Sequence, residues 1–354
     1  MNDEIRVSGL MSGSSLDGVD LACCSFSLHQ DRWNYRILKA ETLPYPASLK
    51  ESLSGALKWN TARMDQCDRE LGDFYGHLIR DFHTRHELRP HLVASHGHTL
   101  VHEAEKGITF QAGSGKRIAH ICGLPVVNDF RREDVENGGQ GAPLVPVGDR
   151  LLFGEFDACI NLGGFANISY DDHRKQRIAF DTGPANLALN YIANLTGRDF
   201  DENGILASAG RPDPELLARL DALEYFHRSP PKSLGREWFH KHYLPLLESY
   251  PLSPENLAAT VSQQIALSIS RAVACSRAKI ILVSGGGALN STLMARIKKS
   301  SAAEFHIPEP ELIHFKEALV FAFLGLLRYR GEINCLASVT GGRTNLSTGS
   351  IYHP

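Results

Sequence analysis

In the first part of the chain, apolar runs separated by polar segments predict strands, and a later periodic pattern predicts a long helix. Two apolar runs, residues 5–10 and 19–26, flank a polar segment rich in glycine and are expected to pair as a β-hairpin. Residues 33–43 predict a third strand. In residues 61–88, apolar side chains recur every three or four positions, which indicates a helix with one buried face.

The second half of the chain repeats this order. Apolar runs at residues 158–162 and 165–170 flank Gly163 and Gly164, which predicts a second hairpin about 150 residues after the first. Two halves that each begin with a hairpin indicate two related α/β domains. Further elements expected in this half are a helix with Ser253 as its N-cap, a buried strand and a buried final helix, at 253–279, 280–283 and 316–329.

The length of 354 residues also favours two domains, because single cores rarely serve chains longer than about 250 to 300 residues. Between residues 128 and 146 the composition changes from charged to rich in glycine and proline, which is typical of a linker. We therefore expect an N-terminal domain at 1–130, a C-terminal domain at 131–344 and a ligand cleft between them. The tail, 345–354, is expected to pack back on the N-terminal domain.

Charge and cysteine content exclude several classes of partner and compartment. The net charge is −3 and lysine and arginine form no concentrated run, so nucleic acid and membranes are not expected as partners and a small-molecule ligand is favoured. The seven cysteines are scattered, without a C-x-x-C pair, and lie mostly in apolar runs, which predicts reduced thiols in a cytoplasmic protein. No signal peptide is expected, and the longest apolar run, 318–327, is half a membrane span.

Residues 9–20, GLMSGSSLDGVD, form the most distinctive polar segment. Gly13 and Gly18 would let main-chain N–H groups converge on an anion, and the serines of the segment would add hydroxyl donors. Asp17 or Asp20 could hold a metal ion, directly or through water. The segment lacks the lysine of a P-loop and opens no predicted helix, so composition alone leaves both phosphate binding and an ordinary hairpin loop open.

This segment resembles the G-x-M-S-G-T-S-x-D-G-x-D signature of the anhydro-N-acetylmuramic acid kinases, with Ser14 where the family usually has threonine. The resemblance covers nearly the whole chain and implies two ribonuclease-H-like domains of the sugar kinase, actin and heat-shock ATPase superfamily, flanking a nucleotide and sugar cleft. Further stretches that resemble family motifs, in the same order, are residues 95–99, 129–146, 161–168, 180–186 and 284–290.

ATP and Mg²⁺ are the ligands that the resemblance implies. ATP would be held by both hairpins and by the glycine run that follows the strand at 280–283, and Mg²⁺ by Asp17 and Asp20, directly or through water. The ATP-binding residues expected on this basis are Gly13, Ser14, Ser15, Leu16, Asp17, Gly18, Val19, Asp20, Gly163, Gly164, Gly285, Gly286 and Gly287.

Asp181 is the strongest candidate for a catalytic residue. It follows a predicted strand at 177–180 and precedes a helix expected to begin near Pro184, so its carboxylate is expected at the carboxyl end of a strand, facing the cleft. From these residues alone, capping of that helix is an equally open role. The resemblance implies that Asp181 is the catalytic base.

The reaction that the resemblance implies opens the 1,6-anhydro ring of anhydro-N-acetylmuramic acid with water and places the γ-phosphoryl group of ATP on O6. The product is N-acetylmuramic acid 6-phosphate, an intermediate of murein recycling. Because phosphorus captures the leaving oxygen in place of a proton, one general base suffices. The alternatives are a kinase for another amino or anhydro sugar and a non-catalytic sugar-binding relative, and Asp181 argues against the second. A homodimer is compatible with the sequence.

Four residues are expected to hold the sugar: Thr99, Arg131 and Gln140 lie in matched motifs, and Glu317 lies at the start of the final predicted helix. The alternative roles are a surface arginine in a solvated loop for Arg131 and a charge in the first turn of a helix for Glu317. The sequence departs from the family pattern, which usually has glutamine, glycine and aspartate, at His98, Ala185 and Asn190.

Overall fold

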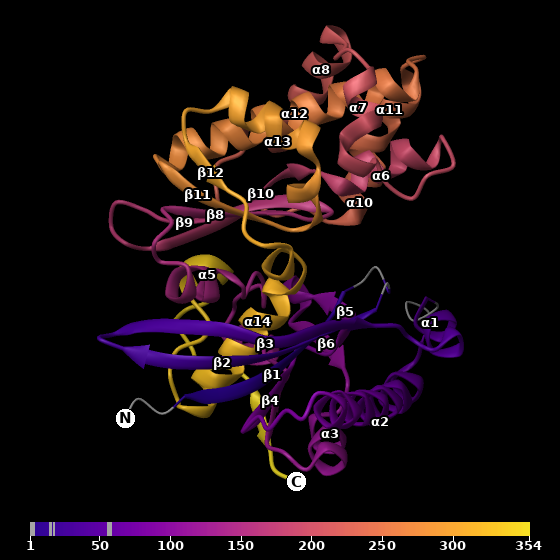
Figure 1. The fold of residues 1–354 in the computed structure, drawn as a ribbon. Coiled ribbons are helices and arrows are strands. Elements are labelled where there is room, and N and C mark those ends of the chain that lie inside the picture. Colours follow the sequence, from indigo (N-terminus) through magenta and orange to yellow (C-terminus); the bar gives the residue numbers. More distant parts are fainter. Residues whose placement is uncertain (1–3, 14–15, 17, 55–58) are drawn as a thin grey trace. The chain divides into compact units, whose positions relative to one another are not determined.

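The computed structural model describes residues 4–13, 16, 18–54 and 59–354. The chain divides into two compact units (Figure 1): unit 1 contains Met1–Leu152 and Phe315–Pro354, and unit 2 contains Phe153–His314. The division therefore lies after Leu152 and not after residue 130, and the chain returns to unit 1 at Phe315 and not at residue 345.

Unit 1 is built on a mixed sheet that begins with the predicted hairpin. β1 pairs antiparallel with β2, and β2 pairs antiparallel with β3. β4 is parallel to β1, β7 is parallel to β4, and β13 from the C-terminal tail pairs antiparallel with β7. The strands in pairing order are β13 (Ser350–Tyr352), β7 (Val126–Asn128), β4 (Leu92–Ser95), β1 (Ile5–Ser12), β2 (Val19–His29) and β3 (Arg32–Leu43).

The rest of unit 1 is mostly helical, with one separate hairpin. That hairpin consists of β5 (His98–Glu103) and β6 (Ile108–Ala112), joined by the 3-10 turn η2 (Ala104–Lys106). The α-helices are α1 (Ala47–Ser54), α2 (Thr61–Arg85), α3 (Gly115–Cys122), α4 (Arg132–Glu136), α5 (Pro146–Leu152), α15 (Ala337–Thr340) and most of α14 (Pro310–Tyr329).

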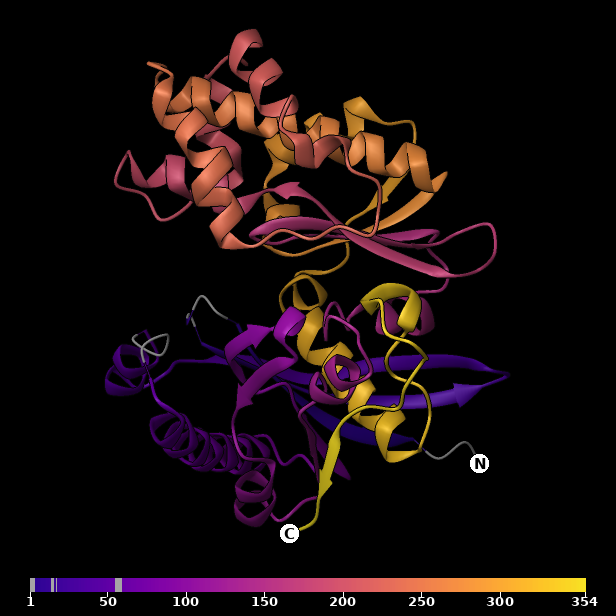
Figure 2. The same cartoon turned by 180° about the vertical axis from the view of Figure 1, so that it is seen from behind.

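Helices α2 and α14 cover opposite faces of this sheet. The buried stripe of α2 belongs to the same core cluster as Leu10 of β1. The preceding residue, Gly9, points to the other face, because successive residues of a strand alternate. A Cβ at Gly9 would lie 1.9 Å from the carbonyl oxygen of Ala318 in α14, so only glycine allows this approach. Figure 2 shows α14, coloured orange to yellow, lying across the sheet of unit 1. Close packing of α14 on β1 places Glu317, the residue before Ala318, beside the strand that leads into the first glycine-rich turn.

Unit 2 repeats the sheet of unit 1. β8 pairs antiparallel with β9, β9 pairs antiparallel with β10, and β11 and β12 extend the sheet on the other side of β8 in parallel. Apart from β13, both sheets thus have the order third, second, first, fourth, fifth strand. The prediction of two related α/β halves is confirmed. The strands are β10 (Arg177–Pro184), β9 (Phe165–Asp171), β8 (Ala158–Leu162), β11 (Ile280–Ser284) and β12 (Glu304–His306).

Helices pack around the sheet of unit 2, and α12 contributes most to their core. Its N-cap is Ser253, whose side chain accepts a hydrogen bond from Asn256 N, as the sequence predicts. The helical segments are α6 (Asn186–Asn194), η3 (Glu202–Gly204), α7 (Ile205–Ala209), α8 (Pro214–Asp221), α9 (Glu224–His227), α10 (Arg236–Trp238), η4 (Phe239–Tyr243), α11 (Leu244–Ser249), α12 (Pro254–Ser276), η5 (Gly286–Leu289) and α13 (Ser291–Ser300).

Two elements are longer than the sequence predicts, and both carry candidate site residues. β10 continues through Asp181 to Pro184, with a bulge between Asp181 and Gly183. α14 begins at Pro310, before the predicted start at residue 316, because proline at the first helical position lacks only an N–H that has no partner within the helix.

Two further observations concern membranes and thiols. No helix in the described part of the chain is both long and apolar enough to cross a membrane. All seven cysteines are free, as predicted, and burial raises the pKa of Cys67 to about 11.

Candidate functional site

The turn between β1 and β2 is the first predicted phosphate-binding element. Leu16 N donates a hydrogen bond to Gly13 O over 3.3 Å, and Leu16 has a positive φ of 57°. A Cβ at Gly18 would lie 2.7 Å from Cγ2 of Thr42, so the end of this turn packs tightly against β3. Three of the residues expected to bind ATP, Ser14, Ser15 and Asp17, lie outside the described residues.

A buried chain of hydrogen bonds holds the end of β1, which leads into this turn. Ser12 Oγ, at the end of β1, is hydrogen-bonded to Nδ1 of His98 at 2.8 Å and to the hydroxyl of Tyr45. The Tyr45 hydroxyl is in turn hydrogen-bonded to that of Tyr75 at 2.8 Å. Burial lowers the pKa of His98 to about 4, so the ring is neutral at pH 7. His98 therefore contacts the hairpin through Ser12, a role that the motif comparison did not suggest for it.

Arg131 is held in a fixed orientation inside unit 1. Its Nη1 donates to Gly141 O over 2.6 Å, and Nε and Nη2 donate to Nε2 of His96 over 3.1 and 2.8 Å. His96 accepts these bonds because burial and the charge of Arg131 keep its pKa well below the usual value, and its Nδ1–H donates to Gly97 O. The alternative of a solvated surface arginine is wrong, and His96 is a positioning residue that the sequence analysis did not single out.

The loop that carries Gln140 is fixed by a buried carboxylate. Asp134 Oδ2 accepts a hydrogen bond from Gly141 N over 2.7 Å, and Oδ1 accepts one from Oγ1 of Thr340 over 2.7 Å. Gln140 N donates to Thr340 O over 2.8 Å, and the side chain of Gln140 is exposed. Asp134 and Thr340 are far apart in sequence, so no local pattern could have paired them.

Glu317 lies near other charged groups of unit 1. Burial raises the pKa of Glu317, the nearby Asp20 raises it further, and Lys316 and Arg131 oppose this rise. Lys316 itself forms a buried ion pair with Asp149 at 2.7 Å. Because α14 begins at Pro310, Glu317 is in the third turn of the helix, and the alternative of a charge in the first turn is wrong.

Thr99 is the fourth residue expected to hold the sugar, and it is half-buried on β5. His102 on the same strand has a pKa lowered by burial and by Arg131, and it is hydrogen-bonded to the main chain of Gln140. Unit 1 thus contains all four residues expected to hold the sugar. Arg131 bonds to Gly141, the residue after Gln140, and its charge opposes the raised pKa of Glu317.

Unit 2 brings the remaining predicted glycines together. Gly164 O accepts hydrogen bonds from the N–H groups of Ala185 and Leu187 over 2.8 and 3.1 Å, so the turn after β8 is tied to the start of α6. A Cβ at Gly287 would lie 2.7 Å from Cβ of Leu162, which brings the loop 285–287 against the same turn. By contrast, a Cβ at Gly286 would meet its nearest atom only at 3.8 Å.

Asp181 is also in unit 2, within β10. Its carboxylate Oδ2 accepts a hydrogen bond from Leu234 N over 2.8 Å. Burial raises the pKa of Asp181 to about 6, and the bond from Leu234 opposes this rise. The N-cap of α6 is Ala185, which makes no side-chain capping bond, and Asp181 precedes it on the strand. The helix-capping alternative for Asp181 is therefore wrong, and so is its expected place at the end of the strand.

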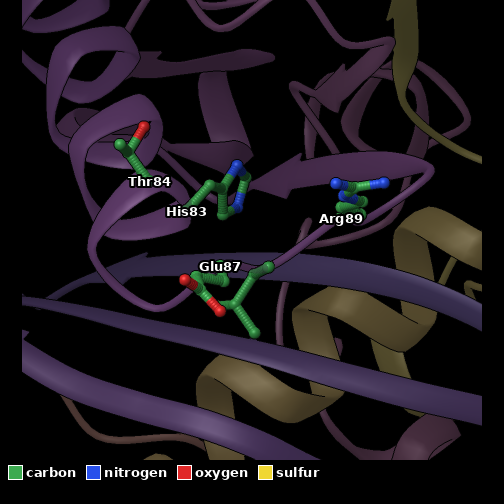
Figure 3. A pocket seen from close by; sticks show the side chains of 5 residues that line it. His83, Thr84, Glu87 and Arg89 are labelled. Carbon is green, nitrogen blue, oxygen red and sulfur yellow. The ribbon is translucent and has the colours of Figure 1, made fainter.

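Two pockets lie elsewhere. One, of about 500 Å³, is at the end of α2, and His83 on its wall is hydrogen-bonded through Nε2 to Ser8 Oγ at 2.8 Å (Figure 3). The other, of about 260 Å³, belongs to unit 2 and includes Tyr225 and Trp238 in its wall. None of the predicted site residues that the structure describes lines either pocket.

Comparisons with known proteins match the whole length of the chain. Residues 5–354 match the family model described as anhydro-N-acetylmuramic acid kinase. The chain is 37% identical to the anhydro-N-acetylmuramic acid kinase of Streptomyces coelicolor, covering 98% of this chain and 93% of that one. It is 36% identical to the enzyme of the same name from Methylorubrum extorquens, covering 99% of both. A ROK family glucokinase from Streptomyces griseus, solved with glucose and AMPPNP, has a TM-score of 0.40 at 12% identity, covering 91% of this chain and 99% of that one.

Proposed function

The chain belongs to the anhydro-N-acetylmuramic acid kinase family, and on this premise we propose that it converts anhydro-N-acetylmuramic acid, water and ATP into N-acetylmuramic acid 6-phosphate and ADP. It is an ATP-dependent sugar kinase. In the proposed reaction a water oxygen bonds to C1 of the sugar and the C1–O6 bond breaks. O6 then bonds to the γ-phosphorus as the bond from phosphorus to the β-phosphate oxygen breaks, and one proton is released.

The environment of Asp181 is the observation that carries this proposal. A general base must be deprotonated at the working pH and yet bind a proton readily, and it works best when its pKa is near that pH. Burial raises the pKa of Asp181 to about 6, much closer to neutrality than that of an ordinary aspartate. In the proposal, Asp181 removes a proton from the water that attacks C1. Since O6 is captured by phosphorus, no second carboxylate is needed as an acid.

Unit 1 supplies the residues proposed to hold the sugar. Muramic acid carries a carboxylate, for which a guanidinium is a well-matched partner. Arg131 uses three of its N–H groups on His96 and Gly141, and two of the five that a guanidinium offers are left for a ligand. We assign sugar hydroxyl and amide contacts to Thr99, Gln140 and Glu317.

ATP is proposed to bind to the glycine-rich turns of both units and to the loop 285–287. Small residues at these positions let main-chain N–H groups approach phosphate oxygens. Mg²⁺ usually takes one or two carboxylates together with phosphate oxygens and water. We propose that the Asp20 carboxylate, which accepts a hydrogen bond from Oγ1 of Thr42 over 2.6 Å, is one of them. Bound there with Asp17, Mg²⁺ would neutralise charge on the phosphates.

Two further features follow from this proposal. We propose a cytoplasmic location, because ATP, the proposed phosphoryl donor, is made and used in the cytoplasm. Every residue in the proposed chemistry comes from one chain, so a homodimer is not required for it.

The proposal is tested by incubating the chain with anhydro-N-acetylmuramic acid and Mg-ATP and measuring the mass of the product. We expect one product that is heavier than the sugar by one water and one phosphoryl group. A product that gains only the phosphoryl group would indicate an ordinary kinase and contradict the coupled ring opening.

A further inference from the structure

Helix α9 and the segment that follows it hold Asp181 through three hydrogen bonds. Leu234 N donates to the carboxylate Oδ2 over 2.8 Å, and Asp181 N donates to Lys232 O over 3.2 Å. The hydroxyl of Tyr225 donates to Asp181 O over 2.7 Å. Burial keeps the pKa of Tyr225 above its usual value, so this hydroxyl remains a donor at neutral pH. The main chain and one carboxylate oxygen of Asp181 are thus both held by residues between 225 and 234.

Lys232 contacts both Tyr225 and Asp181. Its Nζ donates to Tyr225 O over 3.1 Å and lies 4.8 Å from the centre of the Tyr225 ring and 5.7 Å from that of Phe180. The Tyr225 ring also packs against Trp238 at 5.4 Å. Tyr225 is 2% exposed, so it can move little once these contacts form. The bonds from Lys232 to Tyr225, from Tyr225 to Asp181 and from Asp181 to Lys232 close a ring.

We propose that Tyr225, Lys232 and Leu234 are positioning residues that fix the Asp181 carboxylate so that Oδ2 is occupied and Oδ1 receives the proton of the attacking water. This inference rests on the proposed role of Asp181 as the base. Among the described residues, Oδ1 of Asp181 has no hydrogen-bond partner. A carboxylate tied through one oxygen presents the other in one direction, which reduces the reorganisation needed when the water binds.

One of these contacts, the hydrogen bond from Leu234, also affects the pKa of Asp181, which burial raises. The Leu234 N–H stabilises the ionised carboxylate and therefore lowers the pKa of Asp181 against the effect of burial. The titratable groups that pack around Asp181 are Tyr225, which is neutral, and Lys232, whose pKa is lowered by burial and by the nearby Arg271 and Arg228. Loss of the Leu234 N–H is thus expected to raise the pKa of Asp181. The acid limb of the plot of kcat against pH should then move to higher pH.

Two variants test the clamp formed by Tyr225, Lys232 and Leu234. Tyr225→Phe removes only the hydroxyl that holds Asp181 O, and we expect kcat to fall about tenfold while the KM for ATP changes less than twofold. Its matched control is Tyr191→Phe, which removes an exposed hydroxyl bonded to Glu248 in the same unit and should leave kcat unchanged. Leu234→Pro removes the N–H, and we expect the midpoint of the acid limb to rise by about one pH unit.

Leu234→Ala retains the N–H and is expected to keep the midpoint, whatever its effect on kcat. The pKa of Asp181 is also measured without turnover, by ¹³C NMR titration of its carboxyl carbon, assigned with Asp181→Asn. If circular dichroism shows that Leu234→Pro does not fold, the kcat of Tyr225→Phe alone tests whether these residues position Asp181. Wild-type kcat and midpoint in the folded variants, with Asp181→Asn inactive, would overturn the clamp and leave the proposed function intact. An active Asp181→Asn would instead overturn the base and, with it, this inference.

Discussion

Replacing Asp181 with asparagine should abolish turnover and stabilise the fold, and the two effects have different causes. The amide keeps the size of the side chain, and its oxygen can still accept the hydrogen bond from Leu234 N. It cannot take a proton from water. Loss of a general base typically lowers a rate by about 100- to 10,000-fold, and we expect kcat to fall at least this far, with affinities for ATP and sugar within a few-fold of wild type.

The effect on stability follows from the pKa of Asp181. Its rise from 3.8 to about 6 corresponds to about 3 kcal/mol of destabilisation when the carboxylate is ionised in the fold. This penalty is absent below pH 3.8, grows as the pH rises to 6 and is complete above it. An amide carries no charge, so Asp181→Asn should be more stable than wild type at pH 8, by an amount up to about 3 kcal/mol, and equal to it near pH 4.

Kinetics and chemical denaturation on the same preparations at pH 4 to 8 measure both effects. The control is Asp172→Asn in the same unit, because main-chain hydrogen bonds from Gln176 and Arg174 lower the pKa of this exposed carboxyl. That variant should keep activity and gain no stability as the pH rises. Near wild-type activity in folded Asp181→Asn would refute the role of Asp181 as the base. A stability difference between the two proteins that does not depend on pH would refute the penalty for ionising the buried carboxylate.

Three further predictions concern the ligand sites and the pH profile. Gly286→Val should fold normally, because a Cβ at Gly286 meets its nearest atom only at 3.8 Å, but should weaken ATP binding about tenfold or more and sugar binding little; calorimetry showing equal losses would contradict this. The wild-type kcat should rise with pH through a midpoint near 6, because Asp181 must lose its proton, and a profile flat from pH 5 to 7 would exclude Asp181 as the titrating group. His96→Ala should free Arg131 and raise the KM for the sugar about tenfold while sparing that for ATP, whereas His96→Asn should restore part of the loss.

The local pattern of the sequence predicted the hairpins and helices well, for a physical reason. The apolar runs within residues 5–26 and 158–170 reflect strands that are buried over most of their length, and that information is local. The start of α14 was missed although a signal was present: Pro310 suits the first helical position and Glu311 the first turn. The end of β10 was missed because the strand passes the Thr182–Gly183 segment through a bulge, which has no simple sequence signature.

The residues proposed for the site could be named from the sequence, whereas the residues that hold them in place could not. Asp181 and Arg131 could be named because motifs carry them, whereas Asp134 and Thr340 meet across the fold. The bond from Leu234 to Asp181 comes from a main-chain N–H, which every residue except proline has, so no side chain in the sequence points to it.

In the proposed reaction, water is added at C1 and a phosphoryl group at O6 in one turnover. This coupling is tested most directly by running the reaction with Mg-ATP in ¹⁸O-labelled water, quenching early and fragmenting the product in a mass spectrometer. We expect one ¹⁸O atom in the sugar fragment that contains C1 and none in the phosphate ester. A label in the phosphate ester, or a phosphorylated sugar that keeps the anhydro ring without label, would contradict it.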